Sequence, residues 1–261
     1  MDMVATSIET HSPFRVFSVF RRSWRALRVN PLLYLALALV TSLLVLWFTY
    51  RFLPNFLHSG RRSMPNRVLA FALRELLVMP LQGAAAYAVW QSATDRRASL
   101  VSSVLRTGRR LPFILGVGLI QAILFFTVTV GMALATAPFH SPALLGVALG
   151  VSWIAITIKL AASVPVCTVE GLGPMESIRR SFKLTEGCNL KVFAVVLLLY
   201  ILNRAVERSL PYTLFPLVMG FYSPALPRGL AVIAFLSMLR LLVGGALYYE
   251  LSAAKNAGQE N

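Results

Sequence analysis

Residues 169–187 read VEGLGPMESIRRSFKLTEG, and this stretch decides how the rest of the chain is arranged. Gly171, Gly173 and Pro174 interrupt the backbone and set up a short helix, because proline suits the first helical turn, where its missing N–H costs nothing. The final glycine is the predicted end of this helix. Five residues are expected to shape the stretch: Glu170, Gly171, Gly173, Pro174 and Gly187.

The short helix is predicted to be amphipathic. Met175, Ile178 and Phe182 recur at steps of three and four, so they share one face. Charged residues take the other face: Glu176, Arg179, Arg180 and Lys183. Because long apolar segments flank the helix on both sides, the pattern predicts an interfacial helix of a membrane protein.

The composition indicates the same class of protein. Hydrophobic residues make up 57% of the 261 residues and charged residues 13%, and the mean hydropathy of +0.70 lies far above the soluble range. The net charge of +15 comes from Lys and Arg grouped between apolar blocks. We therefore expect membrane lipids with anionic headgroups as partners, and no nucleic acid.

The N-terminal region contains a second amphipathic pattern. Residues 1–12 are predicted to be a disordered tail, and the first thirty residues lack the apolar core of a cleavable signal peptide. Ser12 and Pro13 then open a helix. Four apolar residues are set against five arginines along it: Phe17, Phe20, Trp24 and Leu27 against Arg15, Arg21, Arg22, Arg25 and Arg28. Aromatic residues opposite arginines predict a helix that lies among the lipid headgroups.

Six membrane spans are predicted within one all-α domain, residues 13–252, which is followed by a tail at 253–261. Their apolar cores are 31–52, 68–93, 111–137, 143–169, 189–202 and 228–251. The fourteen residues of the fifth core give only about 21 Å of helix, which is shorter than a hydrocarbon layer of about 30 Å. This helix must therefore continue through the charged residues that follow it. Residues 211–227, with four prolines, are read as a loop or interfacial segment.

The distribution of basic residues predicts the orientation. With six spans, fifteen Lys and Arg fall in the segments on the N-terminal side of the membrane and seven in the loops on the other side. The positive-inside rule therefore places both termini in the cytoplasm.

A threefold parallel repeat is also predicted. Residues 20–25 (FRRSWR) and 178–183 (IRRSFK) match closely in chemistry, and residues 105–110 (LRTGRR) form a looser third copy. Each copy precedes a pair of spans, which gives units of about 14–92, 99–167 and 174–252. Parallel repeats of this kind occur in transporters. The alternative is that any basic amphipathic helix before a membrane hairpin has this appearance.

The motif at 169–187, followed by Asn189 and an apolar run, and the ending GALYYEL at 245–251 resemble a known family. The family that they resemble is the membrane domain of membrane-anchored glycerophosphoryl diester phosphodiesterases, which also occurs in related stand-alone inner-membrane proteins. In that family the hydrolysis belongs to a separate soluble barrel domain. About ten residues follow the last predicted span, so the resemblance implies the membrane part without the enzyme.

No catalytic constellation is recognisable in the sequence. The ten acidic residues are scattered, and His11, His58 and His140 each stand alone. No serine or cysteine has a histidine in a nucleophile setting, and the Gly171–Gly173 segment is too short for a phosphate-binding loop. We therefore expect a non-enzymatic protein with no cofactor and no metal.

Ionisable residues at membrane depth form the first set of candidate functional residues: Glu75, Lys159, Arg204, Glu207 and Arg240. Such residues cost about 2.5–3.5 kcal/mol each at the centre of a bilayer, so they mark a pathway or pair internally. One hypothesis is that Glu75, Lys159 and Arg240 line a polar cavity of a small transporter or channel for an anionic solute or lipid. The alternative is that Glu75 pairs with Lys159 or Arg240 and ties two spans together, or that each side chain extends to the membrane surface.

The basic residues of the interfacial helices form the second set: Arg21, Arg22, Arg25, Arg179, Arg180 and Lys183. They are expected to contact lipid headgroups, to dock a partner protein or a second copy of the chain, or only to turn the chain between spans. The function expected first is therefore the organisation of lipid or partner proteins at the cytoplasmic face.

Overall fold

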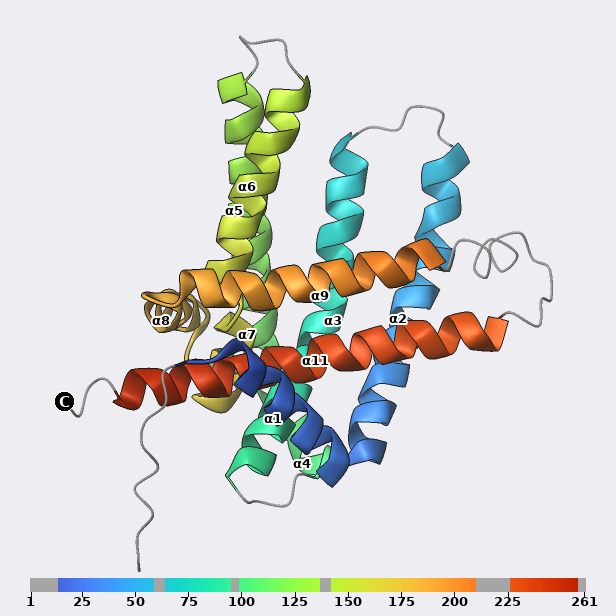
Figure 1. Ribbon diagram of the computed structural model, residues 1–261. Helices are drawn as coiled ribbons and strands as arrows, with labels where there is room; N and C mark the ends of the chain where they lie inside the picture. The colour runs from blue at the N-terminus through green and yellow to red at the C-terminus, as the bar shows by residue number, and fades with distance from the viewer. Residues whose placement is uncertain (1–13, 59–63, 95–98, 137–141, 210–225, 258–261) are drawn as a thin grey trace, which may run out of the picture.

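The computed structural model describes residues 14–58, 64–94, 99–136, 142–209 and 226–257, and this part of the chain is all-helical (Figure 1). The predicted tail at 1–12 lies outside the described residues, as does most of the predicted loop at 211–227. The helices are α1 (Val16–Val29), α2 (Pro31–His58), α3 (Met64–Ala93), α4 (Leu100–Arg109), α5 (Leu111–Thr136), α6 (Pro142–Leu160), α7 (Ser163–Val169), α8 (Pro174–Thr185), α9 (Asn189–Ser209) and α11 (Leu226–Ala257).

Helix α8 begins and ends where its sequence predicts. Pro174 occupies the first helical turn, and the Gly173 N–H donates to Glu176 Oε2 at 3.4 Å, which satisfies one of the free amides of that turn. Gly187 directly follows Glu186, the C-cap residue of α8, and has a φ of +80°. Glycine adopts this left-handed conformation with less steric strain than other residues. Local chemistry alone therefore determines both ends.

Two helix boundaries differ from the prediction. The fourth apolar stretch is not one continuous helix, because it breaks after Leu160 and resumes at Ser163. Pro165 lies in the first turn of α7 and has no N–H to donate to the preceding turn, which favours a new helix start there. At the other end, α11 continues to Ala257, six residues past the predicted end of the sixth span at Leu251.

The predicted continuation of the fifth helix is confirmed, since α9 runs for 21 residues from Asn189 to Ser209. By length and composition, three segments of the described residues are able to cross a membrane: Leu111–Thr136, Leu144–Val169 and Ala234–Asn256. If each of two bent helix pairs is counted as one span, the number rises to five. The α1–α2 pair bends by 104° and the α8–α9 pair by 103°.

The long helices do not all run in one direction. In Figure 1 the α2–α3 pair and the α5–α6 pair point the same way, whereas α9 and α11 run across them. Helix α11 packs against both α2 and α3, and α1 packs against α11. The larger buried cluster lies at this crossing and includes Tyr34, Val89 and Leu242.

The outer part of the α5–α6 pair exposes apolar side chains. Leu119, Ile123, Phe126, Val130 and Leu134 lie on α5 at steps of three and four, and all are exposed. Val147 and Val151 on α6 are exposed as well. A continuous row of exposed apolar side chains on a pair of neighbouring helices is typical of contact with lipid.

Candidate functional site

A cluster of charged residues lies where α1, α4, α7 and α8 meet the C-terminal ends of α3 and α11. We call this region the basic platform; its charged residues are Arg21, Arg22, Arg25, Arg106, Arg110, Glu170, Arg179, Arg180, Lys183 and Glu250. Helix α1 packs against α3 and α11, and α8 packs against α5, α6, α7 and α11. The platform therefore joins all three predicted repeat units.

Helix α1 buries small residues and leaves two of its three aromatic residues exposed. Val19, Ser23 and Ala26 form its buried face, and the Ser23 hydroxyl donates to the Val19 carbonyl at 2.8 Å. Of the predicted apolar stripe, Phe20 and Leu27 pack against the core. Phe17 and Trp24 are 86% and 55% exposed. The stripe is therefore divided between the protein interior and the surface.

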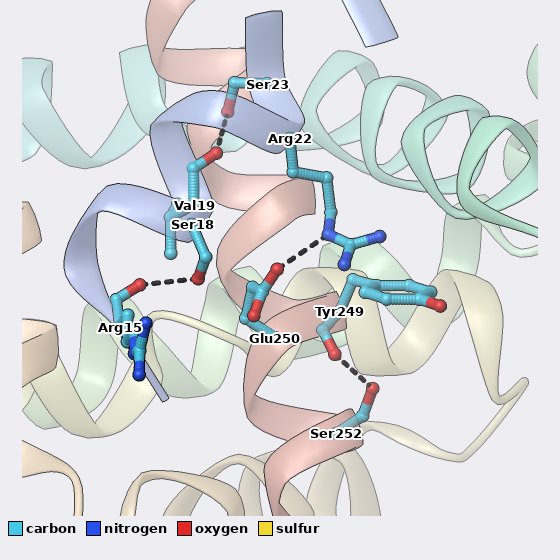
Figure 2. A network of polar contacts seen from close by, with 8 residues as sticks. All are labelled: Arg15, Ser18, Val19, Arg22, Ser23, Tyr249, Glu250 and Ser252. Carbon is cyan, nitrogen blue, oxygen red and sulfur yellow. Dashed lines mark hydrogen bonds and ion pairs between the residues drawn. The ribbon is translucent and has the colours of Figure 1, made fainter. Parts of the chain in front are cut away.

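Arg22 connects α1 to α11, as Figure 2 shows. Its Nε donates to Glu250 Oε1 at 2.7 Å, and its guanidinium carbon lies 4.0 Å from the centroid of the Tyr249 ring. The two charged side chains are 29% and 14% exposed. Partial burial and the ring above the cation make this pair stronger than a fully solvated one.

Arg180 has a similar position on α8. It follows another arginine and precedes a serine, as Arg22 does, and its Nε lies 3.4 Å from Glu170 Oε2. The hydroxyl of Tyr248 donates to the other oxygen of Glu170 at 3.0 Å. Glu170, predicted only to shape the motif, thus connects α8 to α11.

Ser181 closes the break between α6 and α7. Its hydroxyl donates to the carbonyl oxygen of Lys159 at 2.7 Å and accepts from the N–H of Ala162 at 3.3 Å. Both backbone groups flank the break, where the helical hydrogen bonds are interrupted. Ser181 was not among the candidates from the sequence, although its match to Ser23 in the two RRS motifs is a usable signal.

Two arginines of the α4 region approach the loop after α7. Arg110 Nη1 donates to the carbonyl oxygen of Gly171 at 2.5 Å. Arg106 places its guanidinium carbon 5.9 Å from the centroid of the Tyr87 ring. Gly171 has a φ of +76°, and a Cβ there would lie 2.8 Å from Arg110 Nη2. The positive φ favours glycine here, whereas the end of the Arg110 side chain could shift to make room for a Cβ.

The six predicted headgroup contacts divide into two kinds. Arg22 and Arg180 are half-buried and paired with glutamates. The other four are exposed: Arg21, Arg25, Arg179 and Lys183. Exposed apolar residues accompany them, namely Phe17 and Trp24 on α1 and Met175 and Phe182 on α8.

The candidate charges at membrane depth are only partly brought together. Arg240 Nη2 donates to Glu75 Oε2 at 2.6 Å and Nη1 to Oε1 at 3.3 Å, a two-bond pair between α11 and α3. Lys159 belongs to α6, which packs on α5, α8 and α9. Arg204 and Glu207 are in α9, and their side chains lie outside the described residues. The pairing of Glu75 with Arg240 is one of the arrangements considered from the sequence.

Comparisons with protein-family models, curated proteins and solved structures found no match. The resemblance to the membrane domain of glycerophosphoryl diester phosphodiesterases therefore rests on the sequence motifs alone.

Proposed function

We propose that this chain is a six-span, non-enzymatic protein of the bacterial inner membrane that organises anionic lipid at its cytoplasmic face, with both termini in the cytoplasm. The observation that carries the proposal is the exposed face of α1 and α8. Aligning the two RRS motifs places Arg21 with Arg179 and Arg25 with Lys183, and all four are exposed.

The apolar neighbours of these cations support the same interpretation. In the alignment Phe17 corresponds to Met175 and Trp24 to Phe182, and these four side chains are exposed as well. Exposed apolar and basic side chains on one face of a helix are typical of an element lying at the headgroup level. Each Lys or Arg near an anionic leaflet contributes about 1 kcal/mol of attraction.

The threefold repeat is part of this proposal. The bends that follow α1 and α8 are nearly equal, at 104° and 103°. The buried positions also agree, since Ser23 and Ser181 are both buried next to a paired arginine. Two repeats built in the same way would present two equivalent basic faces to the same leaflet.

The test is a quadruple variant that removes the exposed cations: Arg21→Gln, Arg25→Gln, Arg179→Gln and Lys183→Gln. The full-length protein is reconstituted in nanodiscs that mix phosphatidylglycerol with phosphatidylcholine, and native mass spectrometry counts the lipids retained on the protein. We expect the preference for phosphatidylglycerol to fall at least about tenfold, because several favourable contacts are lost together.

A charge-conserving variant is the matched control. Arg21→Lys, Arg25→Lys and Arg179→Lys keep the four positive charges, and this protein should retain most of the preference, since attraction to a leaflet depends on charge. An unchanged preference in the glutamine variant would contradict the lipid role and would favour a partner protein as the occupant of this face.

A further inference from the structure

Helix α4 has the same spacing of buried residues as α1 and α8. Aligning the three helices by their buried residues shifts the third repeat relative to the alignment by sequence. The buried residues of α4 are Ser103 and Thr107, four positions apart. Val19 and Ser23 on α1, and Ser177 and Ser181 on α8, are buried with the same spacing. Aligning Thr107 with the two buried serines is a shift of one residue from the match based on sequence alone. This alignment places Arg106 at the position of Arg22 and Arg180.

The three arginines then share one position but differ in their partners. Arg22 and Arg180 each have a glutamate beside Nε, at 2.7 and 3.4 Å. The Nε of Arg106 is buried and has no hydrogen-bond partner within the described part of the chain. A buried donor without an acceptor is costly, and more so when it carries charge.

A second cation lies beside Arg106. A Cβ on Gly171 would be 2.8 Å from Arg110 Nη2 and 3.6 Å from Arg106 Nη2, so both guanidinium groups flank this glycine. Glu170, the neighbouring carboxylate, already contacts Arg180 and Tyr248. Two adjacent cations repel each other, and an anion between them relieves the repulsion.

We propose that Arg106 and Arg110 bind a phosphate oxyanion beside Gly171. The group takes the place that Glu250 and Glu170 hold for Arg22 and Arg180, and the planar guanidinium forks suit its oxygens. Its source is the headgroup of an anionic phospholipid or free inorganic phosphate. The lipid source rests on the proposed function, because its threefold repeat puts α4 at the headgroup level together with α1 and α8.

The experiment measures the thermal midpoint, Tm, of the full chain in two settings. In neutral detergent the protein is titrated with inorganic phosphate, with chloride at matched ionic strength as the salt control. In phosphatidylcholine nanodiscs it is compared with and without phosphatidylglycerol. The variant is Arg106→Gln, and the matched control is Arg109→Gln, an exposed arginine on the same helix.

A ligand that binds only the folded protein raises Tm with its concentration. We expect this rise in the native chain and in R109Q, and a half-saturating concentration at least about tenfold higher in R106Q, because a hydrogen bond to a charged group is lost. A rise with phosphate shows that the free anion suffices, and a rise with phosphatidylglycerol alone identifies the lipid headgroup. Either result supports the site.

Equal responses of R106Q and R109Q, or no response of the native chain to either probe, would overturn the proposal. If R106Q does not fold, Arg106→Lys and Arg109→Lys are compared instead, and equal responses again decide against the site. The quadruple variant of α1 and α8 keeps Arg106 and should keep the phosphate response. The two proposals can therefore fail independently.

Discussion

The consecutive arginines of the RRS motifs have different environments, although they are chemically identical. Arg21 and Arg179 are exposed, whereas Arg22 and Arg180 are half-buried and paired with glutamates. Neighbouring residues on a helix point about 100° apart, so only one of the two lies beside the buried serine that follows. The second arginine is thus positioned for a structural contact and the first for the surface.

The pair of Arg22 with Glu250 should contribute measurably to stability. We expect Arg22→Gln and Glu250→Gln each to lower the free energy of unfolding by about 1–2 kcal/mol, because each leaves a partly buried charge without its partner. Unfolding in mixed micelles of SDS and a neutral detergent, followed by circular dichroism, measures this loss. The double variant should show a coupling energy of about 1 kcal/mol.

Arg21→Gln is the matched control for this pair, because Arg21 is exposed on the same helix and next in sequence. Its effect should stay within about 0.5 kcal/mol. A coupling energy near zero for Arg22 and Glu250 would mean that the pair is too solvated to matter.

At the level of helices, close packing between α3 and α11 depends on one glycine. A Cβ on Gly245 would lie 2.9 Å from the Ala86 Cα and 3.0 Å from the Val89 Cβ, whereas a Cβ on Gly244 would meet no atom of the described residues within 4 Å. We expect Gly245→Ala to destabilise the protein by about 1–3 kcal/mol, because backbone atoms cannot move aside easily. The same unfolding titration measures the change.

Gly244→Ala is a matched substitution one residue away on the same helix. It should be neutral or stabilise by up to about 1 kcal/mol, because alanine favours the helix and no neighbour is in the way. If both variants lose the same stability, the close approach of α3 and α11 is not what makes Gly245 necessary.

Sequence signals were reliable where structure is local. The ends of α8 follow from Gly173, Pro174 and Gly187, and the length of α9 follows from the thickness of a bilayer. The break between α6 and α7 was missed, although Pro165 was visible, because the break is completed by Ser181 from another helix. The ion pair of Arg22 with Glu250 joins residues 228 positions apart, and no periodicity reveals such a contact.

At the scale of the whole molecule, sequence composition identified helices that suit a membrane but not how they cross. Helix α11 runs across α2 and α3 in Figure 1, and this arrangement depends on packing between distant segments. Three to five segments of the described residues qualify as spans by length and composition. The six-span topology is the prediction that relates the platform to one face of the membrane.

That topology makes a specific prediction for labelling with a membrane-impermeant maleimide. Six spans place the segments before α4 and after α8 in the cytoplasm and the segments after α2 and α5 outside. Single cysteines are introduced at Ser99 and Glu186, which are both exposed, and at Ser59 and Ser141 in the outer segments. The two native cysteines, Cys167 and Cys188, are first replaced by alanine.

In intact spheroplasts the outer pair of introduced cysteines, in place of Ser59 and Ser141, should react at once, whereas those in place of Ser99 and Glu186 should react only after lysis. The reason is that the basic segments stay on the cytoplasmic side, where Lys and Arg are retained during insertion. Labelling of position 186 in intact spheroplasts would place α8 outside and remove the cytoplasmic platform. Protection of position 59 in intact spheroplasts would mean that α2 and α3 do not cross, which would reduce the number of spans to four.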